Sequence, residues 1–211
     1  MAVNVTWLGH ASFRIQGSVV IYIDPWRISD GRNDGDLVLV SHSHYDHWSS
    51  SDVEAVVGPE GRIVGPGDVI SSAGHGEVLA PGGEIDLFGV RLKGVPAYNL
   101  RKPFHPRKKK WLGFLMDIDG VRLYYAGDTD RIPEMAELDG VDLALLPAGG
   151  TYTMNAPAAA DTARDIGAVR ALPYHWGSIV GREADARKFA ERLGPTGLIL
   201  QAGETTAIDE S

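Results

Sequence analysis

The stretch LVLVSHSHYDH, residues 37–47, places three of the chain's seven histidines directly after a run of apolar residues. A short run rich in Val and Leu is typical of a buried strand. The polar cluster that follows it contains His42, His44, Asp46 and His47. Imidazole and carboxylate groups are ligands that suit zinc, manganese or iron. Four side chains so close in sequence do not enclose a metal by themselves, so further ligands must come from elsewhere in the chain.

Polar side chains also stand at the ends of other predicted strands. In α/β folds, ligands gather beyond the carboxyl ends of strands. Besides the run before the histidine cluster, five apolar runs end in a metal-competent side chain: His10, Asp24, Asn99, Asp128 and His175. Taken singly, each is more often a turn former or an ordinary hydrogen-bonded residue. If the strands converge on one edge, these side chains converge too, and they supply the missing ligands.

Strand-like and helical patterns occur in both halves of the chain. Helices are predicted at 49–57, where a serine caps the first turn, at 155–168, where Asn155 is the cap, and at 183–194, which Gly194 ends. A hairpin is predicted to turn at Asp119-Gly120. Further strands are predicted at 3–8, 12–15, 19–23, 37–41, 61–65, 76–80, 90–97, 141–150, 169–176, 197–201 and 205–208. This pattern predicts an α/β protein, two sheets face to face with helices outside, forming one domain over residues 1–211 from two similar halves.

The composition narrows the class of protein. A hydrophobic fraction of 44% is enough for a substantial core. The chain has no cysteine, which excludes disulfides, thiolate ligands and cysteine nucleophiles. The start, MAVNVTWLGH, lacks the basic and apolar regions of a secretory signal, and no apolar run approaches the ~20 residues that a membrane span needs. We therefore expect a cytoplasmic protein without a membrane span.

The charge is distributed unevenly. The net charge is −8, yet residues 101–110 hold six cations and no acid. Such a run is either a solvated loop or a site for an anionic partner. Because it follows the strand exit at Asn99, we expect it to overhang the site and to bind an anionic substrate. The residues predicted to do so are Arg101, Lys102, Lys108, Lys109 and Lys110.

The motifs SHSHYDH, YYAGDTD and LPYHWGS, in this order, resemble those of the metallo-β-lactamase superfamily of metal-dependent hydrolases. The segments TWLGHASF, IYIDP and LALLPAGGTYTM extend the resemblance over residues 4–180. Within the superfamily they resemble the branch of ascorbate-6-phosphate lactonase and, more distantly, N-acylphosphatidylethanolamine phospholipase D. The resemblance implies a four-layer αββα sandwich with two metal ions.

The resemblance also implies roles for particular residues. His42 and His44 resemble ligands of the first metal, and Asp46, His47 and His175 resemble ligands of the second. Asp128 resembles the carboxylate that bridges both metals. Two divalent ions are implied, zinc or manganese first, with iron or nickel as other options.

The chain departs from the family pattern at one ligand. The first site normally takes a third histidine at the strand exit where this chain has Asn99. His105 could complete the site from the basic segment, or Asn99 could bind weakly through its amide oxygen. Otherwise the first site is empty and a single ion is held by Asp46, His47, Asp128 and His175.

The predicted chemistry is hydrolysis. Two metals can hold a hydroxide at neutral pH and polarise the bond under attack, so we expect cleavage of an ester, lactone or phosphodiester in a small anionic molecule. Asp46 and Asp128 are the predicted catalytic residues. His10 and Asp24 are predicted to orient the ligands from behind.

Two alternatives stay open. The six cations could serve a nuclease acting on RNA or DNA, although the acidic remainder of the chain argues against nucleic acid. A non-catalytic metal-binding protein with a decayed first site is the other alternative. The oligomeric state does not follow from the sequence.

Overall fold

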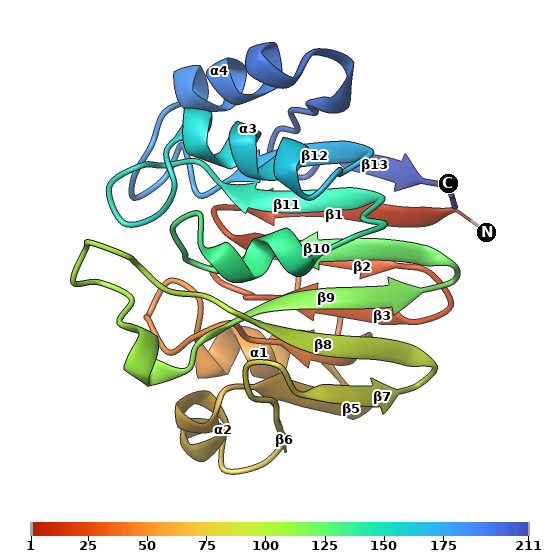
Figure 1. The fold of residues 1–211 in the computed structure, drawn as a ribbon. Helices are drawn as coiled ribbons and strands as arrows, with labels where there is room; N and C mark the ends of the chain where they lie inside the picture. Colours follow the sequence, from red (N-terminus) through yellow and green to blue (C-terminus); the bar gives the residue numbers. More distant parts are fainter. Residues whose placement is uncertain (1, 211) are drawn as a thin grey trace.

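The first sheet of the computed structural model, which describes residues 2–210, places the ends of β3 and β4 at one edge. Its seven strands run in the order β13-β1-β2-β3-β4-β5-β6 (Figure 1). Strands β1 to β3 form an antiparallel meander, whereas β3, β4, β5 and β6 run parallel. The bounds are β1 (Val3–Gly9), β2 (Ser12–Gln16), β3 (Val20–Ile23), β4 (Gly35–Leu39), β5 (Val57–Gly65), β6 (Glu77–Val78) and β13 (Thr205–Ile208).

The second sheet brings the ends of β10 and β12 to the same side. Within the described residues it has six strands in the order β12-β11-β10-β9-β8-β7. Strands β10, β11 and β12 are parallel, and the others are antiparallel. The bounds are β7 (Glu84–Leu87), β8 (Val90–Pro96), β9 (Leu112–Ile118), β10 (Val121–Tyr125), β11 (Leu143–Pro147) and β12 (Arg170–Tyr174).

Helices cover the outer face of each sheet. The helices α1 (Ser50–Val56) and α2 (Gly67–Ala73) pack on the first sheet, and α3 (Ala156–Asp165) and α4 (Glu183–Leu193) on the second (Figure 1). Short 3₁₀ turns lie at Arg107–Lys109, Pro133–Glu137 and Gly194–Thr196. The four layers are those of the αββα sandwich of the metallo-β-lactamase type.

Strand β4 shows how the sequence produces these layers. Its side chains alternate, so Leu37 and Leu39 join the core between the sheets, while Val38 packs with Val53 and Val56 beneath α1. A strand buried on both faces needs a continuous apolar run rather than an alternating one. The run LVLV therefore fixes β4 in the centre of the sandwich and carries the histidine cluster to its end.

The predicted elements are largely present. Ser49 caps α1, Asn155 caps α3, and Asp119 and Gly120 make the β9–β10 turn with positive φ angles of 51° and 81°. The predicted strand at 197–201 is wrong: Leu198 to Leu200 lie against the core half-buried, and only an isolated bridge from Gly197 to Ala171 is formed there.

Two elements were not predicted. Helix α2 spans seven residues and strand β7 only four, of which two are acidic. Segments of this length are too short to show a clear period. Over residues 2–210, the longest apolar helical stretch falls short of what a membrane crossing requires.

Candidate metal centre

Three histidines from two separate loops form the first group of donors. His42 and His44 follow β4, and His105 comes from the long loop between β8 and β9, which projects at the left in Figure 1. One ligand atom from each lies within 4.8 Å of the others. His42 and His105 are 1% exposed. The structure thus places His105 where a third histidine completes the first group.

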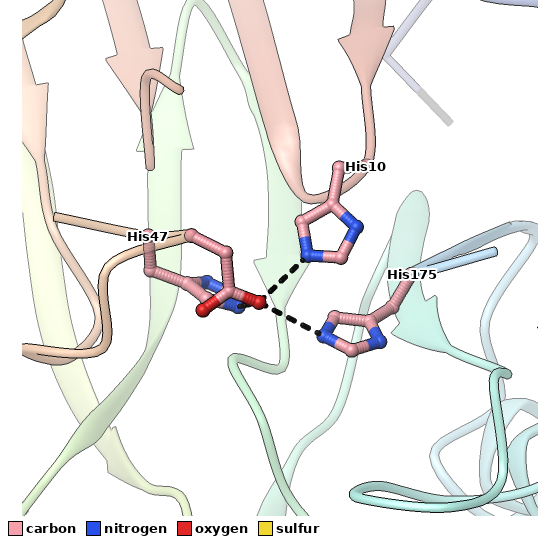
Figure 2. Close-up of side chains that lie close together, drawn as sticks. His10, His47 and His175 are labelled. Atoms are coloured by element: carbon pink, nitrogen blue, oxygen red, sulfur yellow. Dashed lines mark hydrogen bonds and ion pairs between the residues drawn. The ribbon is translucent and has the colours of Figure 1, made fainter. Parts of the chain in front are cut away.

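A second group contains His10, Asp46, His47 and His175, whose donor atoms also lie within 4.8 Å of one another. The rings of His10, His47 and His175 surround one carboxylate (Figure 2). Oδ2 of Asp46 is 3.0 Å from Nε2 of His10, 3.9 Å from Nε2 of His47 and 4.0 Å from Nε2 of His175. The side chains come from three separate loops, since Asp46 and His47 are adjacent, so only the tertiary fold brings them together.

Asp128 lies between the two groups. Its Oδ2 is 3.3 Å from Nε2 of His105 and 3.2 Å from Nε2 of His175, and its Oδ1 is 3.5 Å from Nε2 of His47. Gly127 is needed to aim it, because φ there is +67° and an added Cβ would lie 2.3 Å from the carbonyl oxygen of Leu112. One carboxylate therefore faces donors of both groups.

Several of these donor atoms lack a hydrogen-bond partner among residues 2–210. They are buried, and they point into the space that the groups enclose: Nε2 of His47, His105 and His175, and Oδ1 of Asp128. A buried polar atom without a partner is costly. Metal ions would satisfy these atoms, so the residues present fit a metal centre with nitrogen and oxygen ligands.

The charge state of the centre suits cations. Burial alone would raise the pKa of Asp128, but His175 and His47 hold it well below its usual range. Burial lowers the pKa of His42 well below 6.5, and it lowers the pKa of His44 as well, so both rings are neutral at pH 7. Neutral imidazoles and ionised carboxylates are the forms that bind metals.

Unlike His42 and His44, His47 has a raised pKa, and this makes metal binding depend on pH. Burial opposes its charged form, but the carboxylates of Asp128 and Asp24 raise the pKa of His47 to about 9. A histidine must lose its proton before it binds a metal. Raising the pH from 7 to 8 is therefore expected to strengthen the binding of an ion at His47 about tenfold. Calorimetric titration with Zn²⁺, in buffers of different ionisation enthalpy, measures both the affinity and the proton released; a pH-independent affinity would contradict this.

The raised pKa of His47 has the opposite effect on the stability of the metal-free protein, which falls as the pH rises, whereas metal affinity increases. The folded-state value lies above the ordinary 6.5, so protonated His47 stabilises the fold fully below pH 6.5. That contribution is lost as the pH rises through about 9.

Asp24 orients one histidine of each group, His47 directly and His42 through Ser41. It is fully buried, and its carboxylate accepts hydrogen bonds from Nδ1 of His47 at 2.7 Å, Oγ of Ser41 at 2.5 Å and the hydroxyl of Tyr125 at 2.6 Å. The backbone N–H of Ser41 donates to it as well, at 2.7 Å. Nδ1 of His42 donates to Oγ of Ser41, at 2.9 Å. Both imidazoles thus turn Nε2 towards the ion site, as in other metal centres.

His10 holds Asp46 in place at the second group. Its Nε2 is paired with Oδ2 of Asp46, and its carbonyl oxygen accepts a hydrogen bond from the backbone N–H of His175. His10, Asp24 and His175 have φ angles of 50°, 43° and 62°. This left-handed conformation is uncommon outside glycine and concentrates at functional sites. Each residue turns the chain sharply at a strand exit.

Asn99 acts on His105 instead of replacing it. Its Oδ1 accepts hydrogen bonds from the backbone N–H and from Nδ1 of His105, at 3.0 and 3.2 Å, and its Nδ2 donates to the carbonyl of Tyr152 at 2.9 Å. The amide oxygen is therefore occupied, and Nε2 of His105 is left to face Asp128. Of the three arrangements that the sequence left open, the position of His105 beside His42 and His44 favours the one in which His105 is the third ligand; which residue binds an ion stays a prediction.

A cavity of about 240 Å³ opens onto both donor groups. Its floor is formed by donor residues, and its wall by side chains that the sequence did not single out. The lining consists of His44, Tyr45, Asp46, Phe104, His105, Asp128, Tyr152, His175 and Ile179. The wall residues come from four different loops, so no motif in the sequence could connect them.

None of the five basic residues predicted to bind substrate lines this cavity. Lys102 is held by Asp130 at 2.5 Å and by the carbonyl of Thr153 at 2.6 Å. Lys109 lies above the Trp111 ring and 3.9 Å from Asp68. The other three are exposed: Arg101, Lys108 and Lys110. The segment overhangs the site mainly through Phe104 and His105, not through its cations.

A four-layer αββα sandwich with His and Asp clusters at one end of its sheets defines the class of metallo-β-lactamase-fold metalloproteins. A model of the Beta-lactamase superfamily domain matches residues 4–175. A UPF0173 metal-dependent hydrolase of Nitratidesulfovibrio vulgaris (strain DP4) is 32% identical, over 92% of this chain and 88% of its own. The corresponding protein of Thermococcus onnurineus is 31% identical, over 96% and 98%. The chain belongs to this UPF0173 family of metal-dependent hydrolases within the β-lactamase superfamily.

Solved structures agree with this fold. A crystal structure described as a metal-dependent hydrolase of Parabacteroides distasonis superposes with a TM-score of 0.84 at 28% identity, covering 94% of this chain and 91% of its own. Igni18, a metallo hydrolase of Ignicoccus hospitalis, superposes with a TM-score of 0.81 at 23% identity, covering 99% of each chain, and supports the fold alone.

Proposed function

We propose that this protein hydrolyses an ester or lactone bond of a small molecule, with two divalent ions, zinc or manganese, at the two donor groups. The observation that carries the proposal is the position of Asp128, whose two oxygens face His47 on one side and His105 and His175 on the other. His42, His44 and His105 would hold one ion, and Asp46, His47 and His175 the other. Asp128 would contact both.

The chain's own residues supply the remaining functions. When bound, two divalent ions would lower the pKa of a water molecule and polarise the bond under attack. Asp46 lines the cavity and is kept in one orientation by His10, so it would orient the attacking water, take up its proton and pass that proton to the leaving oxygen as the C–O bond breaks. Asp24 and Asn99 would keep the ligand rings aimed. The four wall residues would exclude bulk water from the reacting bond.

The expected anionic substrate loses its support, because the cations on which it depended do not line the cavity. The same placement leaves no cationic track at the cavity for the phosphates of a nuclease substrate. Resemblance to the branch of ascorbate-6-phosphate lactonase and N-acylphosphatidylethanolamine phospholipase D keeps lactones and phosphodiesters among the bonds to test. Fold alone does not transfer a substrate.

The test is hydrolysis with and without metal. Protein loaded with Zn²⁺ or Mn²⁺ is assayed on p-nitrophenyl acetate, a γ-lactone and bis(p-nitrophenyl) phosphate, before and after removal of the ions by chelation. The proposal predicts turnover of the carbonyl substrates that chelation abolishes and added metal restores. Absence of turnover on all three would favour a non-catalytic metal-binding protein, and turnover of the diester alone would favour phosphodiester chemistry.

A further inference from the structure

Exposed apolar side chains gather at the mouth of the metal cavity. Large hydrophobic residues are exposed at seven positions within the described chain, and three of the seven line this one cavity. They are Tyr45, Phe104 and Ile179, which are 68%, 39% and 39% exposed. They lie on the loops β4–α1, β8–β9 and β12–α4. Single exposed apolar residues are ordinary, but a group around a concave site marks a binding surface.

The wall is fixed relative to the metal donors. Phe104 packs edge-to-face on Tyr152, with ring centroids 4.7 Å apart and planes at 86°. The carbonyl of Tyr152 accepts a hydrogen bond from Nδ2 of Asn99, whose Oδ1 binds His105. Phe104 also directly precedes His105 in the sequence. A ring held this way is ready for a ligand and needs little reordering when one binds.

The lining carries no cation. Its ionisable groups are the histidine donors and the carboxylates of Asp46 and Asp128, along with Tyr45 and Tyr152. Lys102, on the loop that carries Phe104, is held by Asp130 and does not line the cavity. An anionic group placed against the wall would therefore lose its hydration without gaining a partner. Bound ions would attract the carbonyl end of a substrate and not the end that touches the wall.

The size of the cavity limits what it holds. At about 240 Å³ it is smaller than the ~300–1,000 Å³ of pockets for drug-sized ligands. One aromatic ring next to the reacting carbonyl is of a size that this space holds, whereas a long acyl chain or a nucleotide would extend out of it.

We propose that the substrate is an uncharged carbonyl compound with a single aromatic ring beside the scissile bond, and that this ring packs against Phe104, Tyr152 and Ile179. The proposal rests on the proposed function for the reaction, and on the cavity wall for the ring. On this proposal, specificity comes from apolar contact with the cavity wall and not from the charges of the basic segment.

The test compares three hydroxamic acids that share one metal-binding head group. Acetohydroxamic acid has no ring, benzohydroxamic acid has one, and 4-carboxybenzohydroxamic acid adds a charge to the ring. Their affinities for the Zn²⁺-loaded protein are measured by calorimetry. We expect benzohydroxamic acid to bind about tenfold more tightly than acetohydroxamic acid, from apolar and aromatic contact, and the carboxylate to remove this gain.

Substitutions in the cavity wall test whether the tighter binding of benzohydroxamic acid comes from contact with Phe104 and Ile179. Phe104→Ala and Ile179→Ala are expected to weaken benzohydroxamic acid binding about tenfold and to leave acetohydroxamic acid unchanged. Val169→Ala removes another exposed apolar side chain, 53% exposed at the far end of β12 from the site, and is expected to change neither. A preference for the carboxylated ring, or equal binding of the first two acids, would overturn the proposal, as would full binding to Phe104→Ala.

This design separates the two proposals. If the ring preference holds but no ester or lactone is turned over, the wall stands and the proposed function fails. If small aliphatic esters are turned over and rings bind no better, the proposed function stands and the wall proposal fails.

Discussion

Asp128→Asn is expected to lower hydrolytic turnover by more than a hundredfold and to reduce the metal content per chain. Asp128 faces donors of both groups at 3.2 to 3.5 Å, and an amide keeps its shape but removes its charge and one acceptor oxygen. Replacing residues that only support metal ligands costs about 10–100-fold in affinity or activity. Because Asp128 is proposed to contact both ions directly, its replacement should cost more.

Turnover and bound metal are measured on the same preparation of the Asp128→Asn protein. Asp117→Asn is the control, because Asp117 pairs with Arg122 on the surface of β9 and should behave as the native protein. If Asp128→Asn kept its full metal content and stayed within tenfold of native turnover, Asp128 would not be the shared ligand.

Asp24→Ala is expected to destabilise the metal-free protein by about 3 kcal/mol or more. The substitution leaves the N–H and Oγ of Ser41 and Nδ1 of His47 without the carboxylate that accepts their hydrogen bonds, in a fully buried place. Each buried group left without a partner costs about 1–3 kcal/mol. Because natural domains are stable by only about 5–15 kcal/mol, the loss is a large part of the total.

Urea unfolding of the metal-free variant measures this loss, as a lower midpoint at an unchanged slope. Asp36→Ala is the matched control. Asp36 also accepts a backbone hydrogen bond beside β3, from the N–H of Val20, and losing this one bond should cost about 1 kcal/mol. Equal losses in the two variants would show that Asp24 is not the centre of the buried network.

Much of the candidate site was predictable, because a sequence shows where an apolar run ends and which polar residue follows it. Apolar runs end at His10, Asp24, His42, Asp128 and His175, and the parallel strands carry these ends to one edge of the sandwich. The layers followed from the same runs, since a strand such as β4 is apolar on both faces. Local sequence patterns were sufficient to predict a site residue wherever that residue directly follows a single strand.

The remaining features depend on contacts between loops. Asn99 stands at the strand exit, but whether it binds an ion or a histidine depends on the course of the chain between 99 and 105. The wall residues Tyr45, Phe104, Tyr152 and Ile179 come from four loops and have no spacing in common. The five cations predicted to bind substrate do not line the cavity, because a run of charges in a sequence does not show which way its side chains face; the charge of the substrate stays a prediction.

Metal content per chain tests the central claim of a two-ion centre most directly. Elemental mass spectrometry of the native protein, of His105→Ala and of His75→Ala gives the number of ions in each; His75 is exposed and belongs to neither donor group. On the proposed two-ion centre we expect two ions in the native protein and in His75→Ala, and about one in His105→Ala. Two ions in all three would remove His105 from the first group, and one ion in all three would contradict the two-ion centre itself.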